Sequence, residues 1–253
     1  MLTEISSYDQ LYRDFRWNIP DHFNIATACC DRYADGAGRL ALIYVDEDGS
    51  STRTSFDEMR GLSCRFANVL KAAGLARGDR VAVFLAQSLE LPIVHLAAFR
   101  AGLVSVPLFT LFGEDALQFR LQNSGAKAVV TDAGGLEKLA RIRDRLPELK
   151  TVYVTGDAGF KATAGATSFW SAIEQASDRF DAVDSSADDP AIIIYTSGTT
   201  GNPKGALHAH RVLLGHLPNI EMVHDFMPKP GDVMWTPADW AWIGGLFDAL
   251  FPA

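Results

Sequence analysis

Strand-like and helix-like patterns alternate between residues 80 and 154, and this alternation limits the possible folds more than any other feature of the chain. Short apolar runs are separated by segments whose apolar residues recur at three- and four-residue spacing. Parallel strands joined by helices form right-handed crossovers, which place helices on both faces of a sheet. We therefore predict an α/β fold with mostly parallel sheets covered by helices. The expected strands are residues 80–85, 104–108, 126–131 and 151–154, and the expected helices are residues 89–100, 114–123 and 136–146.

A hairpin and a long helix are predicted before this alternation. Two strand-like runs within residues 40–56 flank Asp48-Gly49, a dipeptide that favours tight hairpin turns. From Phe56 the apolar residues recur at helical spacing as far as Ala73, and Gly74 follows as a helix-ending signal. The sequence therefore predicts a hairpin at residues 40–56 and an amphipathic helix directly after it.

The rest of the chain is expected to begin a second subdomain. Residues 156–168 and the acidic stretch 181–190 are interpreted as surface connections, with a helical segment at 168–177 between them. We predict an N-terminal αβ subdomain over residues 1–180 and an incomplete second αβ subdomain over residues 181–253. The expected elements of the second part are a strand at 191–195, a helix at 211–226 kinked by Pro218, and a strand at 232–236.

The charge balance argues against nucleic acid as a partner. The 253 residues include 23 Lys plus Arg and 31 Asp plus Glu, so the formal net charge is −8 at pH 7. Phosphate backbones attract positively charged surfaces, and the overall field of this chain has the opposite sign.

The cysteines and the apolar segments favour a reduced, cytoplasmic protein. Cys29, Cys30 and Cys64 show no spacing typical of a zinc site, and we predict no metal ligands. The N-terminus lacks the apolar core of a signal peptide. The most apolar stretch, residues 91–109, is interrupted by His, Arg, Gly and Pro, so no membrane span is expected.

The segment from Tyr195 to Gly205 carries the strongest chemical signal. Its sequence YTSGTTGNPKG contains three glycines, four Ser or Thr hydroxyls and one lysine. Glycines let consecutive backbone N–H groups converge on an anion, hydroxyls donate further hydrogen bonds, and Lys204 adds a positive charge. The segment follows an apolar strand, and open α/β sheets bind ligands at the carboxyl ends of their strands. A polyphosphate is the ligand that suits this chemistry.

Two other interpretations of this segment are possible from residue types. A Walker A loop requires Gly-Lys-Ser/Thr, whereas Pro203 precedes Lys204 and Gly205 follows it, so a kinase or GTPase of the common type is disfavoured. The run could also be a flexible linker in which Lys204 is only a solvated charge. The order of the residues favours a third interpretation.

In that order, the run from Tyr195 to Gly205 resembles the phosphate loop of the adenylate-forming enzymes. This superfamily includes acyl-CoA synthetases, firefly luciferase and the adenylation domains of nonribosomal peptide synthetases. Residues 55–108 resemble the N-terminal subdomain of the family, and residues 12–26 resemble the start of acetyl- and medium-chain acyl-CoA synthetases. The resemblance covers essentially the whole chain and favours a CoA ligase.

The resemblance implies a reaction in two steps, with ATP, Mg²⁺, coenzyme A and a small carboxylic acid as ligands. The carboxylate attacks the α-phosphate of ATP to give an acyl-adenylate and pyrophosphate, and the CoA thiol then takes the acyl group and releases AMP. Preorganised donors would stabilise the charge that builds on the departing pyrophosphate. By resemblance the β- and γ-phosphates are held by Thr196, Ser197, Gly198, Thr199, Thr200, Gly201 and Lys204, of which Lys204, Thr199 and Thr200 act in the chemical step.

The tract WTPADWAWIGGL, residues 235–246, is similar to the family segment that lines the acyl pocket. The expected lining residues are Asp239, Trp240, Trp242 and Gly245. The alternative is that these tryptophans only fill a core or a subdomain interface, because Trp is usually buried for its area. A histidine is expected at the position of Leu246 in acetyl-CoA synthetases, so an acid larger or more apolar than acetate is indicated.

His208 and His210 flank Ala209 directly after the loop. Such a pair could bind a metal or act as a base, but no third ligand is identifiable and a carboxylate nucleophile needs no proton acceptor. A structural role is predicted for both histidines.

Several elements of the family's active site have no counterpart in these 253 residues. They are the adenine-binding Tyr-x-x-Thr-Glu segment with its Mg²⁺-binding glutamate, the ribose-binding aspartate, the hinge and the C-terminal lysine. In the final apolar run, Leu246, Phe247, Leu250 and Phe251 are expected to lack later chain that would cover them; the alternative is that this end packs back on the preceding sheet. We therefore expect the N-terminal part of a longer synthetase that is inactive alone. An adenylation domain that loads a carrier protein and a non-catalytic nucleotide-binding module remain the alternatives.

Overall fold

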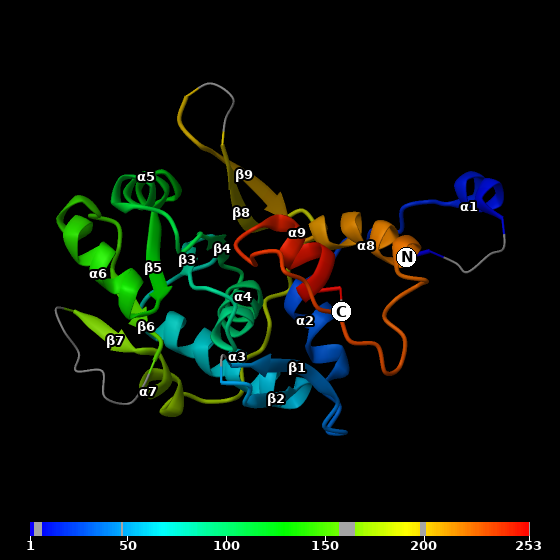
Figure 1. Cartoon of the computed structure of the whole chain (residues 1–253), viewed down its shortest axis with the longest axis horizontal. Helices are drawn as coiled ribbons and strands as arrows, with labels where there is room; N and C mark the ends of the chain where they lie inside the picture. Colours follow the sequence, from blue (N-terminus) through cyan, green and yellow to red (C-terminus); the bar gives the residue numbers. More distant parts are fainter. Residues whose placement is uncertain (3–6, 47, 157–164, 198–200, 253) are drawn as a thin grey trace.

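The computed structural model describes residues 1–2, 7–46, 48–156, 165–197 and 201–252. Among these residues, seven strands form one sheet in the order β7-β6-β5-β3-β4-β8-β9, and two more form a separate hairpin (Figure 1). Neighbouring strands of the sheet are parallel except for β8 and β9. The predicted α/β class with a mostly parallel sheet is confirmed. The strands of the sheet are β3 (Arg80–Phe84), β4 (Val104–Pro107), β5 (Ala126–Thr131), β6 (Thr151–Val154), β7 (Ala166–Ser168), β8 (Pro190–Thr196) and β9 (Lys204–Ala209).

Helices cover both faces of this sheet because side chains alternate along each strand. On β3, Val81 and Val83 belong to one buried apolar cluster, while Ala82 and Phe84 belong to a second cluster on the other face. The first cluster includes residues of α2 (Ile25–Cys29), α3 (Phe56–Ala72), α4 (Glu90–Arg100), α7 (Phe169–Glu174), α8 (Val212–Val223) and η3 (Leu246–Leu250), and the second includes residues of α5 (Glu114–Ser124) and α6 (Ala133–Ile142).

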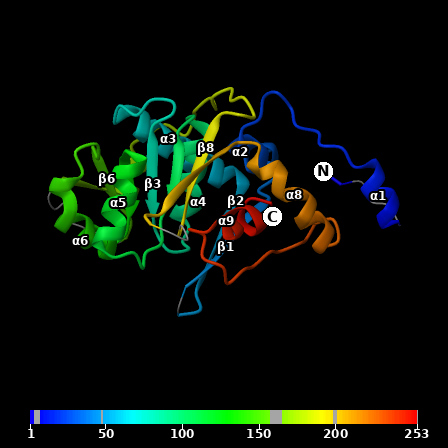
Figure 2. The ribbon, with the colours of Figure 1, turned by 90° about the horizontal axis from the view of Figure 1, so that it is seen from above.

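The remaining helices are short. Figure 2 shows α1 (Tyr8–Asp14) standing apart from the sheet, and none of its residues is buried. None of the described helices is both long and apolar enough to cross a membrane. The other short helices are η1 (Asp31–Tyr33), η2 (Arg143–Arg145) and α9 (Ile243–Gly245).

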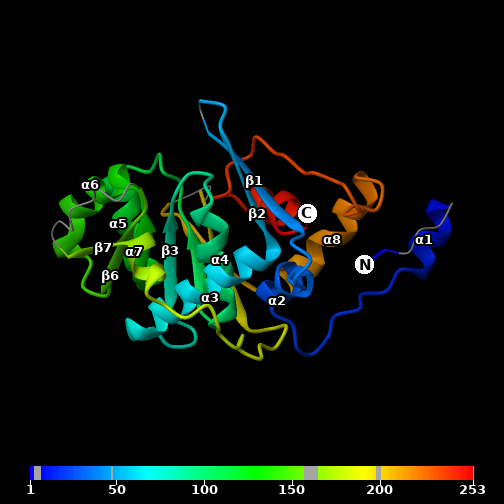
Figure 3. The same cartoon turned by 90° about the horizontal axis from the view of Figure 1, so that it is seen from below.

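The predicted hairpin at residues 40–56 is confirmed. Strands β1 (Leu40–Val45) and β2 (Ser51–Ser55) pair antiparallel, and Gly49 between them has a φ of +84°, in the left-handed region that glycine adopts without strain. The N–H of Ser50 donates to Asp48 Oδ1 over 2.8 Å and closes the turn. In Figure 3 the hairpin lies beside the C-terminal turn of the chain.

The helix predicted after the hairpin is α3, and both of its ends have local causes. Ser55 Oγ accepts from the N–H of Glu58, and Glu58 Oε2 accepts from the N–H of Ser55, so the two residues form a capping box. Beyond the helix, Gly74 has a φ of +82°, which lets the chain turn away after the last helical residue.

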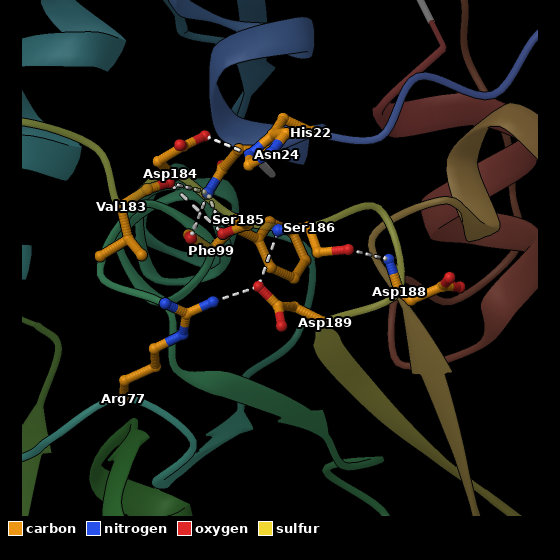
Figure 4. A network of polar contacts seen from close by, with 10 residues as sticks. All are labelled: His22, Asn24, Arg77, Phe99, Val183, Asp184, Ser185, Ser186, Asp188 and Asp189. Carbon is orange, nitrogen blue, oxygen red and sulfur yellow. Dashed lines mark hydrogen bonds and ion pairs between the residues drawn. The ribbon is translucent and has the colours of Figure 1, made fainter.

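The acidic stretch at residues 181–190 is more than a surface connection (Figure 4). Ser185 is buried, and its Oγ lies 3.1 Å from Nδ2 of the buried Asn24. The same Nδ2 donates to the carbonyl oxygen of Phe99 at the end of α4 over 2.9 Å. The prediction of a purely exposed connection is therefore wrong at Ser185, because this residue is hydrogen-bonded to a distant part of the chain.

Two further contacts hold the same stretch in place, and Figure 4 shows the second of them. Ser186 forms an antiparallel bridge with His22, and Arg77 forms an ion pair with Asp189. Asp189 directly precedes the first residue of β8, so these contacts fix where β8 enters the sheet.

Two predictions about the C-terminal part are wrong. β9, which the sequence analysis did not predict, pairs antiparallel with β8, so the loop closes a hairpin where a strand–helix connection was expected. The strand expected at residues 232–236 is absent from this described segment. Asp232 instead accepts a hydrogen bond from the N–H of Lys229 in a turn, and Val233 and Trp235 are exposed. β8 and β9 belong to the same sheet as β3 to β7, and the division at residue 180 stays a prediction.

The final apolar run is covered by earlier parts of the chain, which is the alternative that the sequence left open. Leu246 and Phe247 are fully buried, and Phe251 is 6% exposed. The ring of Phe251 packs edge-to-face on Phe99 of α4, with 5.6 Å between the ring centroids. The run folds back onto α4 because its apolar side chains become buried in the first apolar cluster there.

Candidate functional site

The predicted phosphate loop connects two antiparallel strands at the carboxyl end of β8. Thr196 pairs with Lys204 and Tyr195 pairs with Gly205, so these two pairs form the base of the loop. β8 runs parallel to β4, and the loop therefore lies at the edge where the carboxyl ends of the parallel strands meet (Figure 1). This is the position that the sequence predicted.

The described loop residues are open to solvent. Gly198, Thr199 and Thr200 lie outside the described residues. Thr196, Ser197, Gly201 and Lys204 are exposed, and Gly201 has a φ of +108°. Within the described part of the chain, the ammonium group of Lys204 has no ion-pair partner, so its charge is available to a bound anion.

The base of the loop is tightly packed. Tyr195 is 6% exposed, and its hydroxyl donates to Oδ1 of Asn123 on α5 over 2.7 Å. A Cβ atom at Gly205 would lie 2.9 Å from Cγ2 of Ile193 and 3.1 Å from Cζ of Tyr195. Gly205 therefore allows the two strands to approach closely where the loop begins and ends.

Arg120 of α5 completes this packing and was missed in the sequence analysis. Its guanidinium carbon lies 3.9 Å from the ring centroid of Phe112 and 5.6 Å from that of Tyr195. Burial lowers the pKa of Arg120. The buried residues of α5 are Leu117, Arg120, Leu121 and Ser124, a helical spacing that places an arginine on the covered face. That spacing was the signal available in the sequence.

Two of the predicted pocket residues, Asp239 and Gly245, shape the backbone of their tract. Asp239 Oδ1 accepts from the N–H of Ala241 over 2.8 Å in an Asx turn. A Cβ atom at Gly245 would lie 2.5 Å from the carbonyl oxygen of Asp239. The tract is also attached to the loop after β3, since Gln87 Nε2 donates to the carbonyl oxygen of Ala238 over 2.9 Å.

The two other predicted pocket residues have different environments. Trp240 is partly buried and packs against the first apolar cluster. Trp242 is 42% exposed and lies 5.9 Å, centroid to centroid, from Phe109, which follows β4 at the same sheet edge as the loop. Trp240 is thus packed as the alternative predicts, whereas Trp242 keeps part of its surface exposed, and the assignment of these residues to an acyl pocket stays a prediction.

His210 has a structural position, as predicted. It is fully buried, and its Nδ1 accepts from the N–H of Ile25 over 3.2 Å. Burial lowers the pKa of His210 to about 4. His208 is partly buried, and its pKa is lowered by burial and then by the nearby His216. His216 in turn contacts Asp248 through Nδ1 and Oδ1, which are 2.6 Å apart.

Comparison with known proteins identifies the family. The family model described as "AMP-binding enzyme" matches residues 31–253. The chain belongs to this family. The resemblance of the loop and the preceding elements to adenylate-forming enzymes is thereby confirmed.

Relatives of this AMP-binding chain include acetyl-coenzyme A synthetases. The enzyme of Bacillus subtilis (strain 168) is 35% identical over 259 residues, which cover 98% of this chain and 44% of that protein. The enzyme of Chromobacterium violaceum is 33% identical over 252 residues, which cover 91% and 38% of the two chains. The crystal structure of Brucella canis acyl-CoA synthetase matches with a TM-score of 0.87 and 31% identity over 98% of this chain and 46% of that one. The chain thus spans less than half the length of these relatives.

Proposed function

We propose that the chain provides the phosphate-binding part of an ATP-dependent carboxylate–CoA ligase. The observation that carries this proposal is the match of residues 31–253 to the AMP-binding family, with the loop at the carboxyl edge of the sheet. In the proposed reaction, a carboxylate oxygen attacks the α-phosphorus of ATP and pyrophosphate leaves. The CoA thiol then attacks the acyl carbon, and AMP leaves. The names of the relatives favour CoA over a carrier protein as the acyl acceptor.

The loop would bind the β- and γ-phosphates of ATP. Its backbone N–H groups and hydroxyls would donate hydrogen bonds, and the exposed ammonium group of Lys204 would add a full positive charge. Mg²⁺ would enter with ATP as part of the substrate and neutralise phosphate charge; the exposed hydroxyl oxygens of Thr196 and Ser197 are of the hard type that this ion accepts. Negative charge grows on the departing pyrophosphate, so these fixed donors would stabilise the transition state more than bound ATP. The residues assigned to this role are Thr196, Ser197, Gly198, Thr199, Thr200, Gly201 and Lys204.

A small carboxylic acid is the proposed acyl substrate. Trp242 supports this assignment because it is partly exposed beside Phe109 at the sheet edge that also carries the loop. Asp239 and Gly245 would shape the backbone of the pocket, and Trp240 would support it from the core. An acid larger or more apolar than acetate is proposed from Leu246, the position where the family resemblance expects a histidine for acetate.

Phosphate binding by the loop is tested by titrating the ¹⁵N-labelled chain with inorganic tripolyphosphate and following amide shifts by NMR. We expect saturable shifts at Gly201, Lys204 and Gly205, and binding at least about tenfold weaker in Lys204→Ala, because one full charge is lost. Lys150→Ala is the matched control, since Lys150 is also exposed but directly precedes β6 at the opposite edge of the sheet. Equal losses in the two variants would argue against the loop as the phosphate site.

We further propose that these 253 residues do not catalyse adenylation alone, because the groups that the family resemblance assigns to adenine, ribose and Mg²⁺ have no counterpart in the sequence. Carboxylate-dependent exchange of labelled pyrophosphate into ATP measures the first half-reaction directly. Assays with acetate, propionate and butyrate should give no exchange above background. Robust exchange with any of these acids would overturn this part of the proposal and reveal the acid at the same time.

A further inference from the structure

We propose that Tyr195 and Arg120 form a clamp that positions the phosphate loop on helix α5. The inference rests on the proposed function of the loop and adds two positioning residues outside the glycine-rich segment. Neither residue is placed to contact a phosphate: Tyr195 is 6% exposed and Arg120 is 7% exposed. They would act by holding the two strands from which the loop emerges.

Tyr195 is placed to fix both ends of the loop at once. It directly precedes Thr196, the last residue of β8, and it pairs with Gly205, which directly follows Lys204. Its ring fills the space where a side chain at Gly205 would lie, and its hydroxyl is anchored 2.7 Å from Asn123 Oδ1. A shift of this ring would therefore move the backbone of both strands next to the loop.

Arg120 holds the tyrosine ring from the side of α5. Its guanidinium group packs between Phe112 and Tyr195, and Nη1 donates to the carbonyl oxygen of Ala116 over 2.8 Å. Its buried Nε has no acceptor among the described residues. Desolvating a guanidinium group is costly, and an apolar side chain of similar size would fill the same space without that cost. Filling space alone therefore does not explain an arginine here, whereas stacking between two aromatic rings does.

The clamp is continuous with the predicted acyl tract. Phe112 packs edge-to-face on Phe109, with centroids 5.5 Å apart, and Phe109 packs on Trp242 at 5.9 Å. A chain of direct contacts thus joins the base of the phosphate loop to the exposed tryptophan of the acyl tract. The clamp would fix the position of the loop relative to that tract as well as relative to the sheet.

The first test measures amide hydrogen exchange without any ligand. In Tyr195→Phe and Arg120→Met, exchange at Lys204 and Thr196 should become about tenfold faster, because the hydrogen bonds at the end of a ladder open locally when their support is lost. Exchange in β5 should not change. Tyr153→Phe is the matched control: it removes the hydroxyl of another buried tyrosine, on β6, away from the loop. Unchanged exchange at the loop base in both clamp variants would overturn the inference.

The second test asks whether the clamp acts on the phosphate site. Tripolyphosphate should bind about fivefold more weakly to Tyr195→Phe than to the wild type, because the hydroxyl that anchors the loop base to Asn123 and to the carbonyl oxygen of Arg120 is lost. Tyr153→Phe should bind as the wild type does. The loss of tripolyphosphate affinity caused by Lys204→Ala should also be smaller in the Tyr195→Phe background, because in a displaced loop the lysine contributes less to phosphate binding. Simple additivity of the two losses would mean that Tyr195 only stabilises the fold, and would overturn the positioning role.

The two tests separate this inference from the proposed function. Absence of tripolyphosphate shifts in the wild type would contradict the proposed function, while the exchange data would still decide whether the clamp holds the hairpin. If Arg120→Met does not fold, Tyr195→Phe carries the test alone, because it removes a single oxygen atom.

Discussion

Gly245 packs so closely against Asp239 that no side chain fits between them. A Cβ atom at residue 245 would lie 2.5 Å from the carbonyl oxygen of Asp239 and 3.2 Å from Cα of Trp240. Both obstacles are backbone atoms, which cannot move aside as the end of a side chain can. The glycine therefore sets how α9 lies against the tract that carries Trp240 and Trp242.

Gly245→Ala should destabilise the protein by about 3 kcal/mol, because overpacking against fixed backbone displaces the whole tract. Urea unfolding followed by circular dichroism measures the free energy of unfolding. Gly244→Ala is the control, since its nearest obstacle is only Oδ2 of Asp248, 3.3 Å from the added Cβ. That control should change stability by less than about 1 kcal/mol. Similar losses in both variants would contradict the close approach at residue 245.

Gly205→Ala should cost about 1 to 3 kcal/mol and distort the base of the phosphate loop, because the new methyl group would meet Ile193 and the ring of Tyr195. Thermal unfolding gives the change in stability. In Gly215→Ala, within α8, the added Cβ meets no atom within 4 Å. That variant should be neutral or more stable by up to about 1 kcal/mol, because alanine favours a helix. A neutral result at residue 205 would show that the hairpin base is looser than the structure describes.

Asn24→Ala should destabilise the protein by about 2 kcal/mol or more. The variant removes a buried amide that caps α2 through the N–H of Ala26 and donates to the carbonyl oxygen of Phe99, which then keeps only backbone donors such as the N–H of Gly102 (Figure 4). Asn68→Ala is a matched control, because the Asn68 amide also bonds two carbonyl oxygens, those of Ser177 and Arg179, but does so in solvent. The loss of stability in Asn68→Ala should stay below about 1 kcal/mol. Comparable losses in the two variants would mean that burial of Asn24 adds nothing.

Stability should fall as the pH falls from 6.5 towards 4, and His210 should account for part of this fall. Burial holds the pKa of His210 at about 4, below its ordinary value of 6.5. The unfolded state therefore binds a proton that the folded state excludes, so the stabilisation is complete above pH 6.5 and is lost through that window. Between pH 7 and pH 4.5 this loss should amount to about 2 kcal/mol.

The contribution of His210 is isolated by comparing the wild type with His210→Asn, which offers an acceptor to Ile25 but does not titrate. Burial also lowers the pKa of His95, to about 3, and this group is common to both proteins. Urea unfolding at several pH values should show a shallower pH dependence in the variant. Parallel curves would mean that His210 is protonated in the folded state as readily as in the unfolded one.

Element positions followed closely from local patterns. β5 and β6 have the predicted ends, and α3, α4 and α5 differ from prediction by few residues, because apolar periodicity and capping signals act over one or two turns of chain. β9 escaped prediction since Gly205, Ala206 and Leu207 are exposed on an edge strand, where burial leaves no alternating pattern. The strand expected at residues 232–236 has a short apolar run, but no described strand pairs with it.

The candidate site, like the fold, was predictable from the sequence only in part. The glycines, hydroxyls and lysine of the loop are contiguous in sequence, and their order alone pointed to a phosphate ligand and to the family. Arg120 lies 75 positions before Tyr195 in sequence, so its contacts with Tyr195 and with Phe112 depend on where α5 packs. The roles of Trp240 and Trp242 could not be separated by composition, since only packing left one partly buried and the other partly open.

Sequence was therefore sufficient for the α/β class, the hairpin at residues 40–56, helices α3 to α5 and the family resemblance of the loop, because each depends on neighbours within a short stretch of chain. Tertiary structure decided which strands pair, why Ser185 is buried, how the final apolar run is covered and what supports the loop. These features join residues far apart in sequence, as Asn24 and Ser185 do across 161 positions. Long-range contacts are selected by the packing of the whole sheet, and no local pattern specifies them.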